Sequence, residues 1–181
     1  LSASDVPNIS NSNNLSGMFI NSVNFNTNIS AWDVSSITDM SYSFTDASSY
    51  NQDMSSWNTS NVSNMSGMFR HATSFNQSLG AWNMSNVTNA QEMLSYSGMS
   101  TQKYDDTLRG WASQNLQQNT ELGVIGLHYC TATTERQHII DTFNWNIAGD
   151  SRSCELYLSG GNTSSIQSGS AAGQTAGTLT V

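Results

Sequence analysis

The chain has few charged residues, and very few of them are basic. Of its 181 residues, five are Lys or Arg and 13 are Asp or Glu, which gives a formal net charge of −8. In the first half of the chain, Arg70 is the one basic side chain. Binding to nucleic acid depends mainly on basic groups that neutralise phosphates, and anionic membranes attract basic segments in the same way. We therefore exclude nucleic acid as a partner and expect no attraction to an anionic membrane.

Long apolar runs are also missing. No run approaches the ~20 apolar residues that span a bilayer, so we expect no insertion into a membrane. Leu1 to Ser10 lack the basic start and the apolar centre of a signal peptide. We expect the chain to be a piece of a longer protein, so the lack of a signal peptide says nothing about export.

Cysteine is scarce as well, because the chain contains only Cys130 and Cys154. The two residues allow one disulfide, which suits an oxidising compartment; two buried free thiols are the alternative. A zinc site made by both cysteines with His128 and His138 is a further alternative, but this spacing matches no common zinc framework. We predict the disulfide, and we predict no metal and no cofactor.

The composition otherwise indicates a folded chain. Hydrophobic residues make up 36% of it and charged residues 10%, and Asn, Ser and Thr take the place that charges usually fill. Disordered segments are poor in aromatic residues, whereas this chain has five Trp, six Tyr and six Phe. The aromatic content therefore argues against disorder.

Many residues recur with a period of 25 residues, as Trp32, Trp57 and Trp82 do. Other columns with the same step contain Phe25, Tyr50 and Phe75; Asn26, Asn51 and Asn76; Phe19, Phe44, Phe69 and Leu94; Ile29, Met54 and Leu79; and Ile37, Val62 and Val87. A fixed period of ~20 to 50 residues is typical of a solenoid, in which each unit buries its apolar face against its neighbours.

Each unit combines two local spacings. Val62, Met65, Phe69 and Ala72 lie at steps of three and four residues, as on one face of a helix. We predict helices over about 37–47, 62–72 (with Ser60 as the N-cap) and 87–96. Alternation around the tryptophans predicts short strands over 29–34, 54–59 and 79–84.

The predicted fold class is an α/β solenoid with short parallel strands and short helices, closed by a C-terminal α/β cap. Trp and Met face the core, and the column Asn26, Asn51 and Asn76 forms an inward ladder that satisfies backbone groups. We place the repeats at residues 1–99, the cap at 100–158, and a linker with the start of a following domain at 159–181. Within the cap we expect helices over Lys103–Asn115 and from Thr133 or Thr134 to Phe143, and strands over Gly123–Leu127 and Asn144–Ile147.

The unit from Trp57 to Phe69 and the segment from Ala72 to Gln77 closely resemble the repeat of the BspA-like leucine-rich repeat surface proteins, the DUF285 repeat. Residues 104–111 and 129–147 resemble the cap of those arrays, so the likeness covers roughly residues 14 to 150. It implies a right-handed, leucine-rich-repeat-like solenoid on secreted or surface-anchored bacterial proteins that contact host molecules or other cells. Gly177 to Val181 resemble the entry to the cadherin-like or immunoglobulin-like repeats of large adhesins. No catalytic residues carry over.

We expect no enzyme. His71, His128 and His138 are scattered along the sequence and lie in no catalytic motif. Asp105 and Asp106 form an acidic pair, but they lie early in an expected helix, where acidic residues favour the helix dipole.

The predicted binding surface is the solvent face of the strands. Its outward polar residues are Asp33, Asn58 and Asn83, flanked by Ser35, Ser60 and Ser85. Adjacent coils would place them about 4.8 Å apart, the spacing of paired strands. Amide and hydroxyl groups suit hydrogen bonding to a carbohydrate or a peptide, and an ordinary solvated face is the alternative.

The predicted function is an adhesion module at the bacterial cell surface, monomeric within a longer chain, which binds a glycan or protein on a host or neighbouring cell. A structural spacer without a ligand is the first alternative. The second is ice binding through the hydroxyl row Thr38, Ser63 and Thr88.

Overall fold

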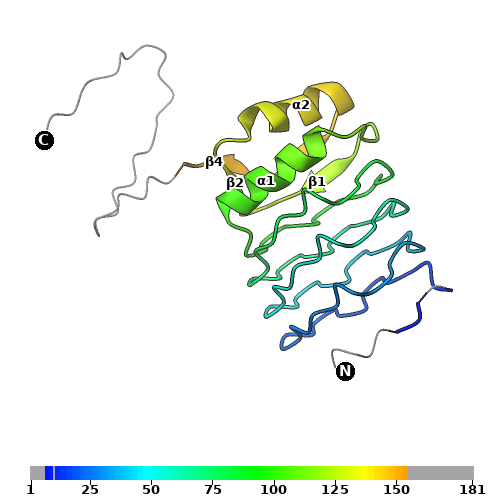
Figure 1. Cartoon of the computed structure of the whole chain (residues 1–181). Helices are drawn as coiled ribbons and strands as arrows, with labels where there is room; N and C mark the ends of the chain where they lie inside the picture. The colour runs from blue at the N-terminus through cyan, green and yellow to red at the C-terminus, as the bar shows by residue number, and fades with distance from the viewer. Residues whose placement is uncertain (1–6, 10, 155–181) are drawn as a thin grey trace, which may run out of the picture.

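The computed structural model describes residues 7–9 and 11–154. Asn14, Asp39, Asn64 and Asn89, each one repeat apart, pair in succession through single parallel β-bridges. We call the stretches that begin at these residues coils 1 to 4; they lie on one another and are covered at one end by two helices (Figure 1). The predicted linker at 159–181 and the last four residues of the predicted cap lie outside the described residues.

Turns, not helices, follow each bridge. Backbone N–H groups that would bond within a helix instead reach the next coil, as Tyr42 N does to Ser66 O at 2.8 Å and Phe44 N to Met68 O at 2.8 Å. We call the stacked segments 15–22, 40–47, 65–72 and 90–97 the turn ladder. The helices predicted over about 37–47, 62–72 and 87–96 are therefore wrong, and Ser60 caps no helix.

Residues in the left-handed backbone conformation are the physical reason for these turns. In each coil two positions have φ between 53° and 66°, namely the columns Gly17, Tyr42, Gly67 and Glu92, and Asn21, Asp46, His71 and Tyr96. A right-handed helix cannot pass through such a residue, because L-residues pay steric strain there and the hydrogen-bond direction reverses. The prediction of a right-handed, leucine-rich-repeat-like solenoid stays a prediction.

The strands predicted over 29–34, 54–59 and 79–84 are also wrong. The inward and outward alternation holds, since Trp57 is 4% exposed while Asn58 is exposed. However, side-chain oxygens bend the backbone at both ends of the segment. Asp53 Oδ1 accepts from Ser55 N at 2.8 Å, and Asn58 Oδ1 accepts from Ser60 N at 3.2 Å. Two such turns within eight residues leave no room for a strand.

Aromatic columns fill the core. Phe44 and Phe69 stack with centroids 5.4 Å apart, and Trp57 and Trp82 stack at 6.2 Å. The indole N–H groups of Trp57 and Trp82 donate to the preceding coil, and Trp111 of the cap continues this pattern by donating to Leu79 O at 2.8 Å. These contacts satisfy the polar edge of each indole inside an apolar core.

The asparagine ladder also bonds to the backbone, as predicted. Asn26 Oδ1 accepts from Asn51 N at 3.0 Å, and Asn51 Oδ1 accepts from Asn76 N at 2.8 Å. Asn76 Oδ1 accepts from Ser100 N at 2.9 Å, which carries the ladder into the cap. The ladder lies at the partly exposed edge of the stack, not inside it as expected.

Helices α1 (Thr101–Ala112) and α2 (Thr133–Phe143) cover the last coil, with α1 next to the coils and α2 beyond it (Figure 1). Strand β1 (Glu121–Gly123) pairs in parallel with β3 (Asn146–Ala148), and β2 (His128–Tyr129) pairs in parallel with β4 (Ser151–Arg152). The bridge between Ala90 and Leu122 joins this cap to coil 4. Within the described residues, neither helix has the length and apolar character needed to cross a membrane.

In the cap, the bounds of the two helices agree with the predicted bounds better than those of the strands do. The helix that ends at Phe143 is confirmed, although Ala132 precedes it and no side chain caps it. The helix expected over 103–115 begins and ends earlier, because Gln114 turns back and donates to Trp82 O at 2.8 Å. The strand expected over 123–127 is wrong except at Gly123, where β1 ends, and the strand expected over 144–147 begins two residues later, as β3.

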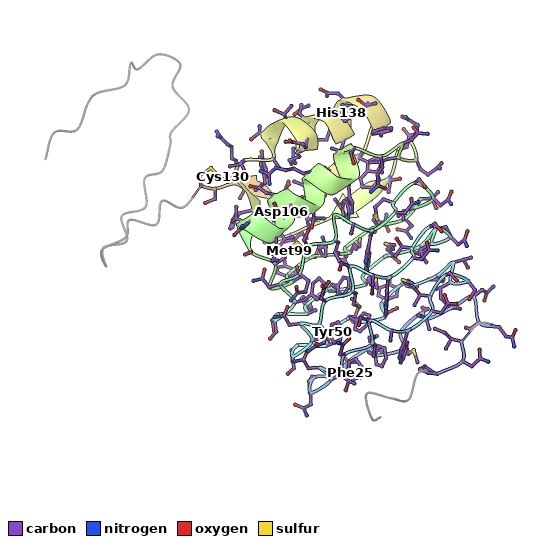
Figure 2. All side chains as sticks on the ribbon, in the orientation of Figure 1. Phe25, Tyr50, Met99, Asp106, Cys130 and His138 are labelled. Atoms are coloured by element: carbon purple, nitrogen blue, oxygen red, sulfur yellow. A yellow bond between two sulfur atoms is a disulfide. The ribbon has the colours of Figure 1, made fainter. Side chains whose placement is uncertain are left out.

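Tyr50→Phe should raise the free energy of unfolding by ~1 kcal/mol. The Tyr50 side chain is fully buried and lies directly above Phe25 in Figure 2. Its hydroxyl has no hydrogen-bond partner among the described residues. Burial first, and then the charge of Asp53, raises the pKa of Tyr50, so the hydroxyl stays protonated and unpaired. Urea unfolding measures the change. Tyr104→Phe is the matched control and should be destabilising, because the Tyr104 hydroxyl donates to Asp150 at 2.9 Å.

Candidate functional site

The predicted polar column lies on the surface, as expected, but one side-chain oxygen of each residue already accepts a hydrogen bond from the backbone. Asp33, Asn58 and Asn83 are all exposed. In each case Oδ1 accepts the backbone N–H of the serine two residues later, at 3.0, 3.2 and 2.9 Å. Hydrogen bonds from the Ser35 hydroxyl and backbone lower the pKa of Asp33. The groups left for a ligand are therefore one carboxylate oxygen and two amide NH₂ groups.

The flanking serines belong mainly to the scaffold. Ser35, Ser60 and Ser85 donate their N–H to the turns just described, and their carbonyls accept side-chain amides from the next unit. These acceptor contacts are Asn61 Nδ2 to Ser35 O at 2.7 Å, Asn86 Nδ2 to Ser60 O at 2.6 Å and Gln117 Nε2 to Ser85 O at 2.7 Å. The sequence did not reveal this second amide ladder, although Asn61 and Asn86 keep the 25-residue step.

The hydroxyl row considered for ice binding is likewise used between coils. Thr38 Oγ1 donates to Asn13 O at 3.1 Å, Ser63 Oγ to Thr38 O at 3.2 Å, and Thr88 Oγ1 to Ser63 O at 3.3 Å. Each hydroxyl proton is therefore directed along the stack, to a backbone carbonyl one repeat earlier.

A different surface gathers exposed aromatic and charged side chains. It lies on the turn ladder, and we call it the tyrosine surface; its residues are Tyr42, Asp46, Arg70, His71, Glu92 and Tyr96. Tyr42 and Tyr96 are 44% and 50% exposed, and no other Phe, Tyr or Trp in the described part of the chain is exposed.

Contacts between coils hold these side chains in place. His71 Nδ1 lies 3.1 Å from Asp46 Oδ1, and the rings of His71 and Tyr96 have centroids 5.1 Å apart. Arg70 Nε lies 3.4 Å from Glu92 Oε2. Because these contacts are substantially exposed, each contributes ~0–1 kcal/mol to stability. Their main effect is to fix positions on the surface.

The sequence contained a signal for this surface that the periodicity analysis passed over. Gly17 and Gly67 occupy one left-handed column and Asn21 occupies the other, and these residue types favour that conformation. Tyr42 and Tyr96 break a pattern that glycine and asparagine satisfy at lower strain. Tyrosines at left-handed positions where coil 1 has glycine or asparagine mark side chains that the turn itself does not require.

The cap contains polar clusters with structural roles. A disulfide joins Cys130 and Cys154 and so closes a loop that contains α2, β3 and β4. Cys130 and His138 lie in separate parts of the cap (Figure 2), and no group of three or more His, Cys, Asp or Glu in the described residues could hold a metal ion. His128 Nδ1 contacts Ser151 Oγ at 2.8 Å, in an exposed position.

Asp105 holds the backbone just before α2. The sequence predicts that it stabilises the dipole of its own helix, but it does not lie in the first turn of α1. Its carboxylate accepts from the N–H groups of Cys130, Thr131 and Ala132 at 3.0, 2.7 and 3.2 Å, and from the Thr131 hydroxyl at 2.7 Å. Neighbouring Asp106 pairs with Arg109 at 2.9 Å. Burial acts to raise the pKa of Asp105, but these hydrogen bonds outweigh it and lower the pKa below 3.8.

Asp105 should therefore make the protein acid-sensitive. A carboxylate with a lowered folded pKa contributes stability that is present above the unfolded pKa and lost as pH falls through the folded pKa. We expect Asp105→Asn to be less stable at neutral pH by ~2 kcal/mol and to lose less stability than wild type between about pH 5 and about pH 2. Urea unfolding at a series of pH values measures both effects. Equal acid dependence in the two proteins would contradict this role.

Comparison with known proteins assigns a family but no activity. The model of the family described as "Mycoplasma protein of unknown function, DUF285" matches residues 2–118. This range includes all four coils and α1. No curated protein and no solved structure matches the chain. The match covers well over half of the sequence, so the chain belongs to the DUF285 family.

Proposed function

We propose that this protein is an extracellular ligand-binding module of a bacterial surface protein, and that it mediates adhesion to a glycan or protein on another cell. In this proposal the stacked coils form a short right-handed solenoid of the leucine-rich-repeat kind. The family description leaves the function open, so the proposal depends on the arrangement of side chains.

The observation that carries the proposal is where the repeats differ from one another. The buried columns keep one kind of residue from coil to coil, as Trp32, Trp57 and Trp82 do. The outward left-handed columns vary instead, from Asn21 and Asp46 to His71 and Tyr96 in one of them. A repeat scaffold that carries varied side chains on one face is the arrangement by which solenoids bind other molecules.

Two further features support the proposal: one favours an extracellular position, and the other favours hydrogen bonding to a ligand. The disulfide between Cys130 and Cys154 belongs to an oxidising environment. The low share of charged residues, 10%, gives the surface Asn, Ser and Thr groups that suit hydrogen bonding with little charge steering.

A binding screen tests the proposal. The purified chain is offered to a glycan array and to whole cells, alongside the triple variant Asp33→Ala, Asn58→Ala, Asn83→Ala. Saturable binding by the wild type supports an adhesion module. Loss of that binding in a folded triple variant would place the site on the polar column. Absence of saturable binding to every glycan and cell would favour a spacer within a longer surface protein.

A further inference from the structure

We propose that the tyrosine surface is a carbohydrate-binding site with a preference for uncharged sugars. This inference rests on the proposed function, since it names the ligand class and the position of the site within a ligand-binding module. It is carried by the conformation of the two tyrosines, by the contacts that hold them, and by the polar groups on the same stacked turns.

The first step is the strain at the tyrosine positions. Tyr42 and Tyr96 have φ of 57° and 59°, and Gly17 and Asn21 occupy the equivalent positions of coil 1. A left-handed conformation costs a bulky residue ~1–2 kcal/mol, and much less in glycine or asparagine. The side chains are exposed, so burial does not offset this strain. Residues kept in strained conformations at the surface are a feature of binding sites.

The second step is the fixed orientation of both rings. A Cβ atom at Gly67 would lie 2.5 Å from Tyr42 Cδ1, so the Tyr42 ring lies against the bare backbone of coil 3. Tyr96 contacts the His71 ring on one side, and a Cβ at Gly126 would lie 3.6 Å from Tyr96 Cδ1 on the other. Rings held in this way lose little conformational freedom when a ligand binds, which favours affinity.

The third step is the set of polar groups on the same stacked turns as the two rings. Asp46 and Glu92 offer carboxylate acceptors, Arg70 offers guanidinium donors, and His71 offers a ring nitrogen. All four side chains are more than one-third exposed. A sugar presents hydroxyl groups, which both donate and accept, around a ring whose C–H face can lie on an aromatic ring. Tyrosines beside paired donors and acceptors therefore match the chemistry of a sugar better than that of an apolar ligand.

The local charge decides between neutral and acidic sugars. Asp46 and Glu92 carry two negative charges and Arg70 carries one positive charge, when histidine is counted as neutral. The chain as a whole has a formal charge of −8. A sialylated or sulfated sugar would meet a negative surface whose one guanidinium is already paired with Glu92, so an uncharged sugar is favoured.

The experiment compares variants chosen to keep the turns intact. Tyr42→Asn and Tyr96→Asn, singly and together, place in these columns a residue that tolerates the left-handed conformation, and Tyr96→Phe keeps the ring. Binding to immobilised neutral oligosaccharides and to their sialylated and sulfated counterparts is measured by biolayer interferometry, with folding followed by urea unfolding. We expect neutral oligosaccharides to bind, with about tenfold or greater loss of affinity in the double Asn variant and near wild-type binding by Tyr96→Phe and by the polar-column triple variant.

The remaining outcomes separate this inference from the proposed function. Sugar binding unchanged in a folded double Asn variant would overturn the site. Binding to acidic sugars only would overturn the charge argument. Binding to cells that persists after enzymatic removal of their glycans would overturn the carbohydrate assignment while leaving the adhesion proposal standing. If the wild type binds neither sugars nor cells, both the inference and the proposed function fall.

Discussion

Trp57→Ala should lower the free energy of unfolding by ~3–5 kcal/mol, the usual range when a buried aromatic side chain is truncated. Trp57 is 4% exposed and lies in the middle of the stack, where its ring faces that of Trp82 at 6.2 Å with only 7° between the planes. Its Nε1–H donates to Ile29 O at 3.2 Å. The alanine variant loses the ring contacts, leaves a cavity between coils, and removes one of the two donors to that buried carbonyl, the other being Trp32 N at 3.0 Å.

Urea unfolding followed by circular dichroism measures the loss, and Asn58→Ala is the matched control. Asn58 is the next residue in the chain and points to solvent, where its side chain supports one turn through Ser60 N. We expect the control to cost ~0.5–1 kcal/mol, the net value of an exposed hydrogen bond. Equal losses in the two variants would show that the assignment of inward and outward positions is wrong.

Asp150→Asn should lower the free energy of unfolding by ~3–5 kcal/mol, because breaking a buried ion pair leaves the other charge uncompensated. Asp150 accepts from Arg136 Nε at 2.8 Å and from Arg136 Nη2 at 2.7 Å, and the two side chains are 1% and 17% exposed. The hydrogen bonds from Arg136 to Asp150 raise the pKa of that guanidinium, which stays charged in the variant. The Arg136 guanidinium also lies 4.9 Å from the centre of the Tyr129 ring, so this cluster joins α2 to β2.

Asp106→Asn provides the comparison for a surface pair. Asp106 and Arg109 contact each other at 2.9 Å within one helical turn, and both side chains are about two-fifths exposed. Such pairs contribute ~0–1 kcal/mol, so urea unfolding should barely distinguish this variant from wild type. An Asp150→Asn variant as stable as Asp106→Asn would mean that the buried pair does not hold the cap together.

The 25-residue period was sufficient to predict which residues are buried. A repeating side chain meets its own equivalents in the neighbouring coils, so an apolar column such as Phe44 and Phe69 has to face inward. The same argument predicted the asparagine ladder, because an amide at a fixed step reaches the same backbone group in each coil. The register of the columns and the burial of the apolar ones therefore followed from the repeat, whereas the asparagine ladder lies at the partly exposed edge and not inside the stack as predicted.

Local conformation did not follow in the same way. Apolar residues at steps of three and four suit a helical face, but Val62, Met65 and Phe69 also face inward from overlapping turns. The difference depends on whether a backbone N–H group bonds within its own segment or to the next coil, and that choice involves carbonyls 24 to 31 residues further along the chain. The polar column was predicted from alternation, whereas the tyrosine surface required the left-handed positions at Tyr42 and Tyr96 to be known.

The hydrogen bonds of the turn ladder run in one direction, and this limits self-association. Alternate N–H groups within the turn ladder donate to the following coil, as Gly17 N does to Ser41 O at 2.9 Å, so the carbonyls of Ser16, Met18 and Ile20 in coil 1 receive no donor from the described residues. Two copies that met at this edge would set carbonyl against carbonyl, which cannot form the ladder that drives edge-to-edge aggregation. The exposed side chains of Met18, Ile20 and Val23 lie on the same coil. Their apolar surface is therefore accompanied by three backbone carbonyls, which can pair with a segment that offers free N–H groups but not with the same carbonyls of a second copy.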